Sequence, residues 1–101
     1  MNHTIRLHSD DNIVVLARSV KEGEVIGIDG AHHPVRASLG LGHKVASRRI
    51  AAGEIILKYG VPIGSATSVI EPGDHVHLHN MKSDYLPTYT LEEGRAFRTT
   101  P

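Results

Sequence analysis

The 101-residue sequence contains no cysteine and no tryptophan, and it has a single phenylalanine. Without cysteine there can be neither disulfide bonds nor thiolate metal sites. Because aromatic residues are scarce, the hydrophobic 40% of the chain is almost entirely Val, Ile, Leu and Ala. These small, often branched residues suit strands better than helices. At a length typical of one domain, the composition predicts a single, mainly β domain.

The sequence also lacks an excess of either charge, with 11 Lys and Arg against 11 Asp and Glu. Binding to nucleic acid or to an anionic membrane surface requires a basic patch, and none is present. Neither a signal-peptide pattern nor an apolar run of ~18–20 residues occurs. We therefore expect a cytoplasmic protein with no nucleic-acid and no membrane partner.

Three segments share a pattern in which a β-branched residue is followed three positions later by Gly and then by an acidic residue. They are Val20 to Glu24, Ile50 to Glu54 and Ile70 to Asp74. We expect each to be a tight bend or one helical turn, with the Val or Ile in the core and the Gly at positive φ. The unequal spacing of the segments excludes a solenoid.

Short alternating or β-branched runs between these bends predict strands. The expected strands are residues 4–8, 13–17, 24–28, 32–36, 55–59 and 75–79, with Asp29-Gly30 as a hairpin turn. Helix is expected only as a few short turns. The folded domain is predicted to span residues 1–82, and residues 83–101 are predicted to be an extended tail, either docked on a partner or disordered.

Eight histidines are present, and three of them alternate in His75-Val76-His77-Leu78-His79-Asn80. In a strand, residues two apart share a face, so the imidazoles would lie together while Val76 and Leu78 face the core. Imidazoles so placed suit a divalent metal. Since same-face neighbours are ~6.5–7 Å apart, we expect two of them to ligate together with groups from elsewhere. The alternative is a solvated strand edge.

A second candidate is Gly42-His43-Lys44, in a glycine-rich bend where the backbone can approach a ligand. Here an imidazole and a cation suit a carboxylate substrate; the alternative is a turn with two surface residues.

The segment from His8 to Asn12 is a third candidate, in which His8 and Asp11 could pair as acid and base or as metal ligands. Its alternative is turn chemistry alone. Near Tyr59-Gly60 a structural corner is the favoured interpretation, with the Tyr59 phenol as a candidate substrate contact.

Five motifs, in order, resemble a known family. They are His8-x-x-Asp11-Asn12; Gly42-His43-Lys44-Val45-Ala46; Ile50-x-x-Gly53; Tyr59-Gly60-x-Pro62-Ile63-Gly64-x-Ala66; and Ile70-x-x-Gly73-Asp74-His75-Val76-His77-x-His79-Asn80. Over residues 4–82 the chain is similar to the SAF domain of altronate dehydratases, galactarate dehydratase and the small subunit of sulfolactate sulfo-lyase.

This resemblance implies a β-clip (SAF-like) fold with short bent strands. It also implies a lyase that removes the proton α to a carboxylate and eliminates water, or sulfite, from a sugar acid or other 2-hydroxy acid. A divalent metal, iron or manganese, shared with a large catalytic subunit is implied as well. Because the chain stops at residue 101, we expect the separate small subunit of such an enzyme; a homo-oligomer stays open.

The resemblance assigns roles to the residues that match its motifs. The implied catalytic residues are His8, Asp11, His43 and Lys44, the substrate-binding residues are Asn12, Gly42, Tyr59, Gly60 and Asn80, and the metal ligands are His75, His77 and His79. The triple-histidine run matches only the altronate and sulfolactate branches, so the chemistry is expected at residues 8–12 and 42–44. Two alternatives remain: a non-catalytic SAF-type sugar-acid-binding module, and a stand-alone metal-binding protein.

Overall fold

The computed structural model describes residues 3–84, which form short strands and, within that range, no helix. The strands are β1 (Thr4–Ile5), β2 (Ile13–Leu16), β3 (Val25–Ile28), β4 (Ala31–Pro34), β5 (Lys44–Ala46), β6 (Ile55–Lys58), β7 (Val61–Ala66) and β8 (Met81–Lys82). The predicted mainly β class is confirmed. In this part of the chain no helix is long and apolar enough to cross a membrane. The predicted tail lies outside the described residues, apart from residues 83 and 84.

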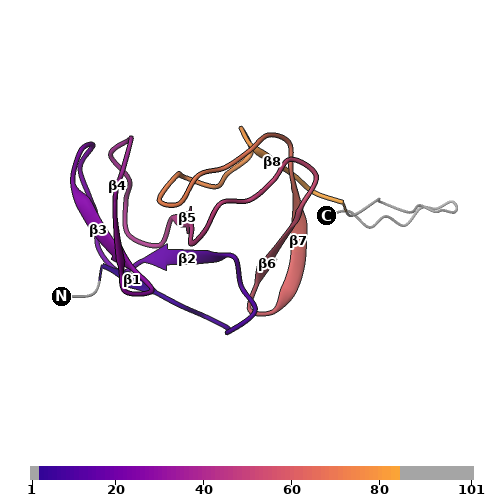
Figure 1. The fold of residues 1–101 in the computed structure, drawn as a ribbon, viewed down its shortest axis with the longest axis horizontal. Helices are drawn as coiled ribbons and strands as arrows, with labels where there is room; N and C mark the ends of the chain where they lie inside the picture. The colour runs from indigo at the N-terminus through magenta and orange to yellow at the C-terminus, as the bar shows by residue number, and fades with distance from the viewer. Residues whose placement is uncertain (1–2, 85–101) are drawn as a thin grey trace, which may run out of the picture.

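The strands form three antiparallel sheets, in the orders β1-β2-β5, β3-β4 and β6-β7-β8. Figure 1 shows the β3–β4 and β6–β7 hairpins on opposite sides of the molecule, with β2 and β5 between them. The segment after β7 arches back over β5 toward β4 (Figure 1), and a Cβ added at Gly73 would lie 3.3 Å from the carbonyl oxygen of Pro34. The two hairpins are therefore joined both by the β2–β5 ladder and by this returning segment.

The chain builds the same backbone unit twice, once in residues 14–43 and again in residues 44–74. The Val20–Leu39 bridge of the first unit corresponds to the Ile50–Ile70 bridge of the second. Likewise, the bond from Leu16 N to the His43 carbonyl corresponds to the bond from Ala46 N to the Asp74 carbonyl, both 2.9 Å. His43 and Asp74 thus hold equivalent positions at the ends of the two units.

Each unit has its own hydrophobic core, and the β2–β5 ladder contributes to both. Residues alternate in direction along a strand, so Val14 and Leu16 enter the first core while Ile13 enters the second. On β5, Val45 enters the first core and Ala46 the second. The ladder therefore fixes the two halves relative to one another.

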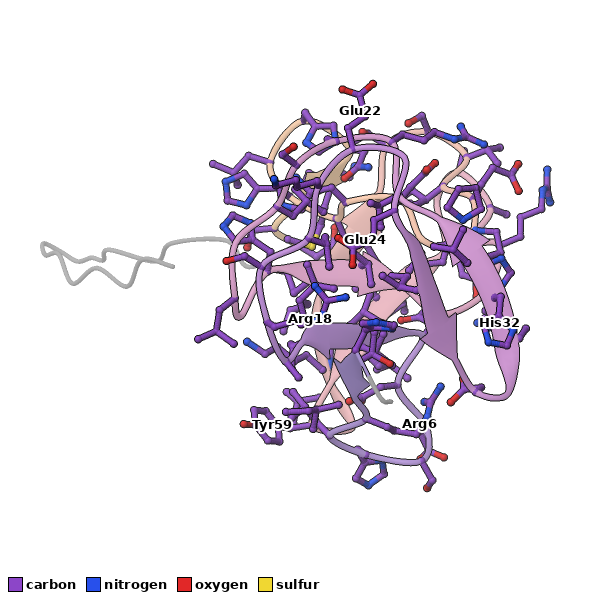
Figure 2. All side chains as sticks on the ribbon, turned by 90° about the vertical axis from the view of Figure 1, so that its left-hand side faces the viewer. Arg6, Arg18, Glu22, Glu24, His32 and Tyr59 are labelled. Atoms are coloured by element: carbon purple, nitrogen blue, oxygen red, sulfur yellow. The ribbon has the colours of Figure 1, made fainter. Side chains whose placement is uncertain are left out.

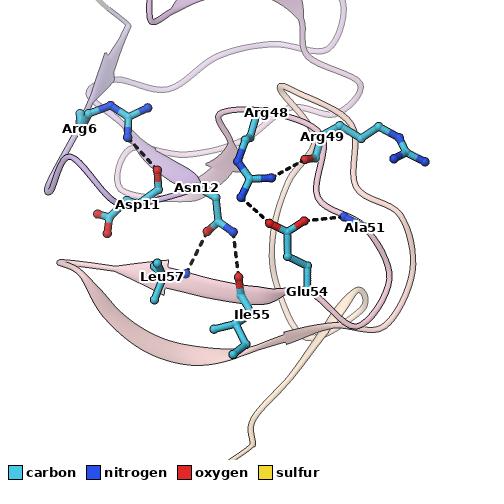
Figure 3. A network of polar contacts seen from close by, with 9 residues as sticks. All are labelled: Arg6, Asp11, Asn12, Arg48, Arg49, Ala51, Glu54, Ile55 and Leu57. Carbon is cyan, nitrogen blue, oxygen red and sulfur yellow. Dashed lines mark hydrogen bonds and ion pairs between the residues drawn. The ribbon is translucent and has the colours of Figure 1, made fainter.

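The three predicted bends are confirmed: Gly23, Gly53 and Gly73 have φ of 88°, 85° and 87°. In each, the carboxylate at the last position accepts a hydrogen bond from the backbone N–H three residues earlier. These bonds join Lys21 N to Glu24 (3.0 Å), Ala51 N to Glu54 (3.0 Å) and Glu71 N to Asp74 (3.2 Å). Arg18 pairs with Glu24, and Arg48 with Glu54 (Figures 2 and 3). We call this five-residue device a capped corner.

A further corner of the same course lies at residues 39–43, and residues 76–80 form a corner closed by similar hydrogen bonds but without a positive φ. In the second of these, Asn80 N donates to the His77 carbonyl, and His77 N donates to Asn80 Oδ1, both at 3.0 Å. The predicted strand over residues 75–79 is therefore wrong: only His75 makes a β-bridge, with Val45, and a turn follows. Val76 is buried as expected, but Leu78 is 76% exposed instead of facing the core.

The other strand predictions hold with changed ends. The strand predicted over residues 4–8 is limited to Thr4–Ile5. Asp29-Gly30 forms the predicted hairpin turn, with φ of 48° and 84°. Tyr59-Gly60, with φ of 58° and 73°, makes the equivalent turn of the second unit.

Candidate active site

Asp11 and Asn12 anchor the β6–β7 hairpin to the start of β2. The buried Asp11 carboxylate accepts hydrogen bonds from Tyr59 N (2.9 Å) and Gly60 N (2.7 Å). The Asn12 amide accepts from Leu57 N and donates to the Ile55 carbonyl, both at 2.9 Å (Figure 3). Both side chains thus have a structural function; their predicted catalytic and substrate roles stay predictions.

His8 lies at the same turn. Its Nδ1 accepts a hydrogen bond from Asp10 N at 3.0 Å, and its ring covers Gly60, where an added Cβ would be 3.0 Å away. The carboxylate of Asp11 is directed to backbone amides rather than to the His8 imidazole. The turn's outermost residue, Tyr59, is 62% exposed (Figure 2).

The second group brings together four imidazoles. Nδ1 of His43 lies 3.0 Å from Nε2 of His75. The His75 ring is stacked on His77 at 5.4 Å between centroids and lies 5.5 Å from His79. Sequence reasoning placed residues 75–79 on a strand; the turn at residues 77–80 instead wraps His77 and His79 around His75. We call residues 43, 75, 77 and 79 the imidazole cluster.

Asn80 orders this turn from inside. Besides accepting from His77 N, its buried side chain donates to the His75 carbonyl at 2.8 Å. Both ends of the amide are therefore engaged with the backbone of the cluster. The predicted substrate-binding role of Asn80 stays a prediction, and its evident effect is to position the histidines.

The cluster holds its central imidazole uncharged. Partial burial, and then the neighbouring charges of His43, His79, His77 and Lys44, lower the pKa of His75 to about 4. Burial and then Lys58 lower the pKa of Lys44 from its usual value. At neutral pH His75 can therefore accept a hydrogen bond from His43 Nδ1 in the tautomer that carries its own proton on Nδ1.

His43 departs from the corner pattern. The corners that end at Glu24, Glu54, Asp74 and Asn80 are capped by the last side chain. At the corner of residues 39–43 the backbone bond is kept, from His43 N to the Gly40 carbonyl at 3.3 Å, and Gly42 has φ of 88°. The imidazole, however, pairs with His75. The sequence predicted a glycine-rich bend here but not its equivalence to the three corners. The signal was present, because Leu39-x-x-Gly42-His43 has the same spacing as Val20-x-x-Gly23-Glu24.

A hollow of about 320 Å³ adjoins the cluster, lined by Leu41, Gly42, His43, Lys44, His75 and His77. We call it the Lys44 hollow. The Lys44 ammonium group suits a carboxylate, and an imidazole can accept or donate a proton. The site can therefore bind a small organic acid and move a proton on it.

A complete metal site is not formed by residues 3–84, where no three His, Asp or Glu side chains are placed to hold one ion. The nearly parallel His75 and His77 rings, 6° apart, do not direct their nitrogens at a common point. The described residues thus do not fit the implied metal as its only ligands.

The predicted site residues fall into two groups at opposite ends of β2. Asp11 precedes the strand, whereas the His43 carbonyl is bonded to Leu16 N at its far end. At ~3.3 Å per strand residue, the separation is on the order of 15 Å. The structure therefore joins His43, Lys44 and residues 75–80, but it does not bring His8 and Asp11 to them.

Over residues 3–84 the fold is an all-β domain built from two corner-and-hairpin units, with a hollow lined by Lys44 and by imidazoles where their ends meet. Residues 2–84 match the family model described as the altronate/galactarate dehydratase SAF domain. The chain belongs to this family.

Similar curated proteins are lyases. The altronate dehydratase of Bacillus subtilis (strain 168) is 36% identical over 84 residues, covering 83% of this chain and 17% of the relative. That of Escherichia coli (strain K12) is 38% identical over 80 residues, covering 79% and 16%. The (2R)-sulfolactate sulfo-lyase subunit alpha of Chromohalobacter salexigens is 43% identical over 49 residues, covering 48% and 52%. The chain thus spans less than a fifth of these altronate dehydratases, and it is a lyase-associated SAF domain.

Proposed function

We propose that this chain supplies one side of the active site of a lyase that eliminates water, or another small leaving group, from a sugar acid or related 2-hydroxy acid. The observation that carries the proposal is the contact of His43 with His75. The His43 imidazole does not cap its own corner but pairs with the uncharged His75 beside Lys44. Membership of a family named for altronate and galactarate dehydratases supports the substrate class.

Elimination needs a group that binds the carboxylate and a group that moves a proton. Lys44 supplies the cation, and its partial burial strengthens the attraction by reducing solvent screening. When His43 donates its Nδ1 proton to His75, the other ring nitrogen is left to exchange a proton with the substrate. His75 acts through His43 and is a positioning residue.

We propose that a large catalytic chain completes the site. Two observations support this arrangement. The chain matches less than a fifth of each altronate dehydratase relative, and the sulfo-lyase relative is named "subunit alpha". The divalent metal, iron or manganese, is proposed to be shared, with the large chain supplying most of its ligands. When bound, such a metal would stabilise negative charge on substrate oxygens.

Reconstitution tests the proposal. The chain, a large lyase chain from the same source, and their mixture are each incubated with altronate, and the 2-oxo acid product is measured. We expect product only from the mixture, in proportion to the complex formed. Equal activity of the large chain alone would refute the catalytic role and would favour the non-catalytic sugar-acid-binding module.

A further inference from the structure

A second hollow also has His75 in its lining. Its volume is about 330 Å³, and its lining includes Arg36, Leu39, Ser68, Asp74, His75 and His79. His75 also lines the Lys44 hollow, so the two spaces share this residue. We call the second space the Arg36 hollow.

The polar groups of the Arg36 hollow are incompletely paired with each other. Arg36 Nε lies 3.6 Å from Asp74 Oδ1, which is too long for a hydrogen bond. The other Asp74 oxygen caps Glu71 N at 3.2 Å. A guanidinium has five N–H donors and no acceptor, whereas a carboxylate only accepts. A hydroxyl group can accept from Arg36 and donate to Asp74, so the pair is suited to a hydroxylated ligand.

The charges of the hollow also discriminate between ligands. Asp74 balances Arg36, so a neutral hydroxylated chain meets no net charge there. A second carboxylate would lose its hydration there without a net positive charge to compensate it, which opposes binding. The apolar floor at Leu39, which is 8% exposed, accommodates the carbon backbone of a ligand.

We propose that the Arg36 hollow binds the hydroxyl-bearing end of the sugar acid whose carboxylate lies at Lys44, and that it selects acids with one carboxylate over acids with two. This inference rests on the proposed function, whose site it extends. Arg36 and Ser68 then determine specificity, and the substrate lies across His75 with its ends in the two hollows.

Titration of the full chain, followed by amide NMR, tests this inference without the large chain. The probes are altronate with one carboxylate, galactarate with two, and the uncharged galactitol. We expect altronate at millimolar concentration to shift signals of both hollows, galactarate to bind several-fold more weakly, and galactitol to leave Lys44 unshifted. Altronate shifts confined to the Lys44 hollow, or none at all, would overturn the inference.

Substitutions in the Arg36 hollow test the inference further through their effect on ligand affinity. Arg36→Ala and Ser68→Ala should each weaken altronate binding, about tenfold for Arg36, since a hydrogen bond to a charged group is lost. Arg49→Ala is the matched control, because Arg49 forms a similar exposed pair with Glu71 at 3.7 Å outside the hollow. Asp74→Asn keeps an oxygen for Glu71 N and should bring galactarate close to altronate in affinity; unchanged selectivity would contradict the proposal.

The two proposals fail in different ways. If the two-chain mixture lacks lyase activity while altronate still fills both hollows, the function is wrong and the binding inference stands. If the mixture is active but Arg36→Ala leaves altronate binding and KM unchanged, the binding inference is wrong and the proposed function stands.

Discussion

His43 occupies a position that elsewhere in this chain stabilises the fold. At the ends of the other corners, Glu24, Glu54, Asp74 and Asn80 each accept a backbone N–H of their own turn. His43 instead directs its ring to His75. Since a local hydrogen bond of this kind contributes about 1 kcal/mol, its loss indicates that the imidazole serves another purpose.

Replacement of His43 by Asp should therefore stabilise the isolated chain and abolish the lyase activity of its mixture with the large chain. A carboxylate at this position should cap Gly40 N, as Asp74 caps Glu71 N. For a domain of this size, about 1 kcal/mol corresponds to a rise of roughly 4–8 °C in the unfolding midpoint, which circular dichroism can measure. His32→Asp, at an exposed strand position, is the control; an equal rise there, or no rise for His43→Asp, would contradict the interpretation.

The lowered pKa of His75 makes stability depend on pH. The imidazole titrates near 6.5 when unfolded and at about 4 when folded, so between these values the unfolded state binds more protons. Stability contributed by neutral His75 is thus present above pH 6.5 and is lost as pH falls toward 4. Urea denaturation at several pH values should show a smaller decline for His75→Asn than for the native chain. A decline as steep in the variant would show that His75 does not cause it.

At the scale of elements, the corners and the first hairpin were predictable from sequence because their signals are local. Val20-x-x-Gly23-Glu24 and Asp29-Gly30 each contain the residues that their turns require. The anchoring role of Asp11 and Asn12 was not predictable. Their partners, at Ile55 to Gly60, lie more than 40 residues away, and a buried polar residue looks the same in sequence whether it binds backbone or substrate.

The segment from His75 to Asn80 shows how periodicity misleads. His and aliphatic residues alternate there as in a strand, yet the segment forms a corner without glycine. Asn80 supplies both the cap for His77 N and a bond to the His75 carbonyl, which the alternation does not reveal. The error mattered for the site, because the turn packs His77 and His79 around His75.

The two hairpin turns provide a matched pair for testing the contact of His8. Gly30 has φ of 84° and open space where a Cβ would be, whereas a Cβ at Gly60, φ 73°, would meet the His8 ring at 3.0 Å. Gly30→Ala should cost about 1–2 kcal/mol for its left-handed conformation. Gly60→Ala should cost about 1 kcal/mol more through crowding, measured by denaturant unfolding, and His8→Ala should remove the difference. Equal costs in the two variants would show that the ring does not constrain this turn.

At the scale of the whole molecule, duplication accounts for the position of the proposed site. The two units end at equivalent positions, His43 and Asp74, and the adjoining His75 lines both the Arg36 hollow and the Lys44 hollow. Where the copies agree, as at Gly23 and Gly53, the residue has a structural role. Where they differ, as at His43, the change coincides with the proposed site. The duplication itself was hidden from sequence because mainly the corners, and not the hairpins between them, retain common residues.

The central claim is that His43 acts in a site shared by two chains. Its most direct test is the lyase rate of the purified two-chain assembly carrying His43→Asn, with the amount of complex measured in the same samples by sedimentation. Asn retains a cap for Gly40 N, as Asn80 does for His77 N, and removes only the titrating imidazole. We expect an intact complex whose kcat falls by about 10²–10⁴-fold. An intact complex with an unchanged rate would contradict it.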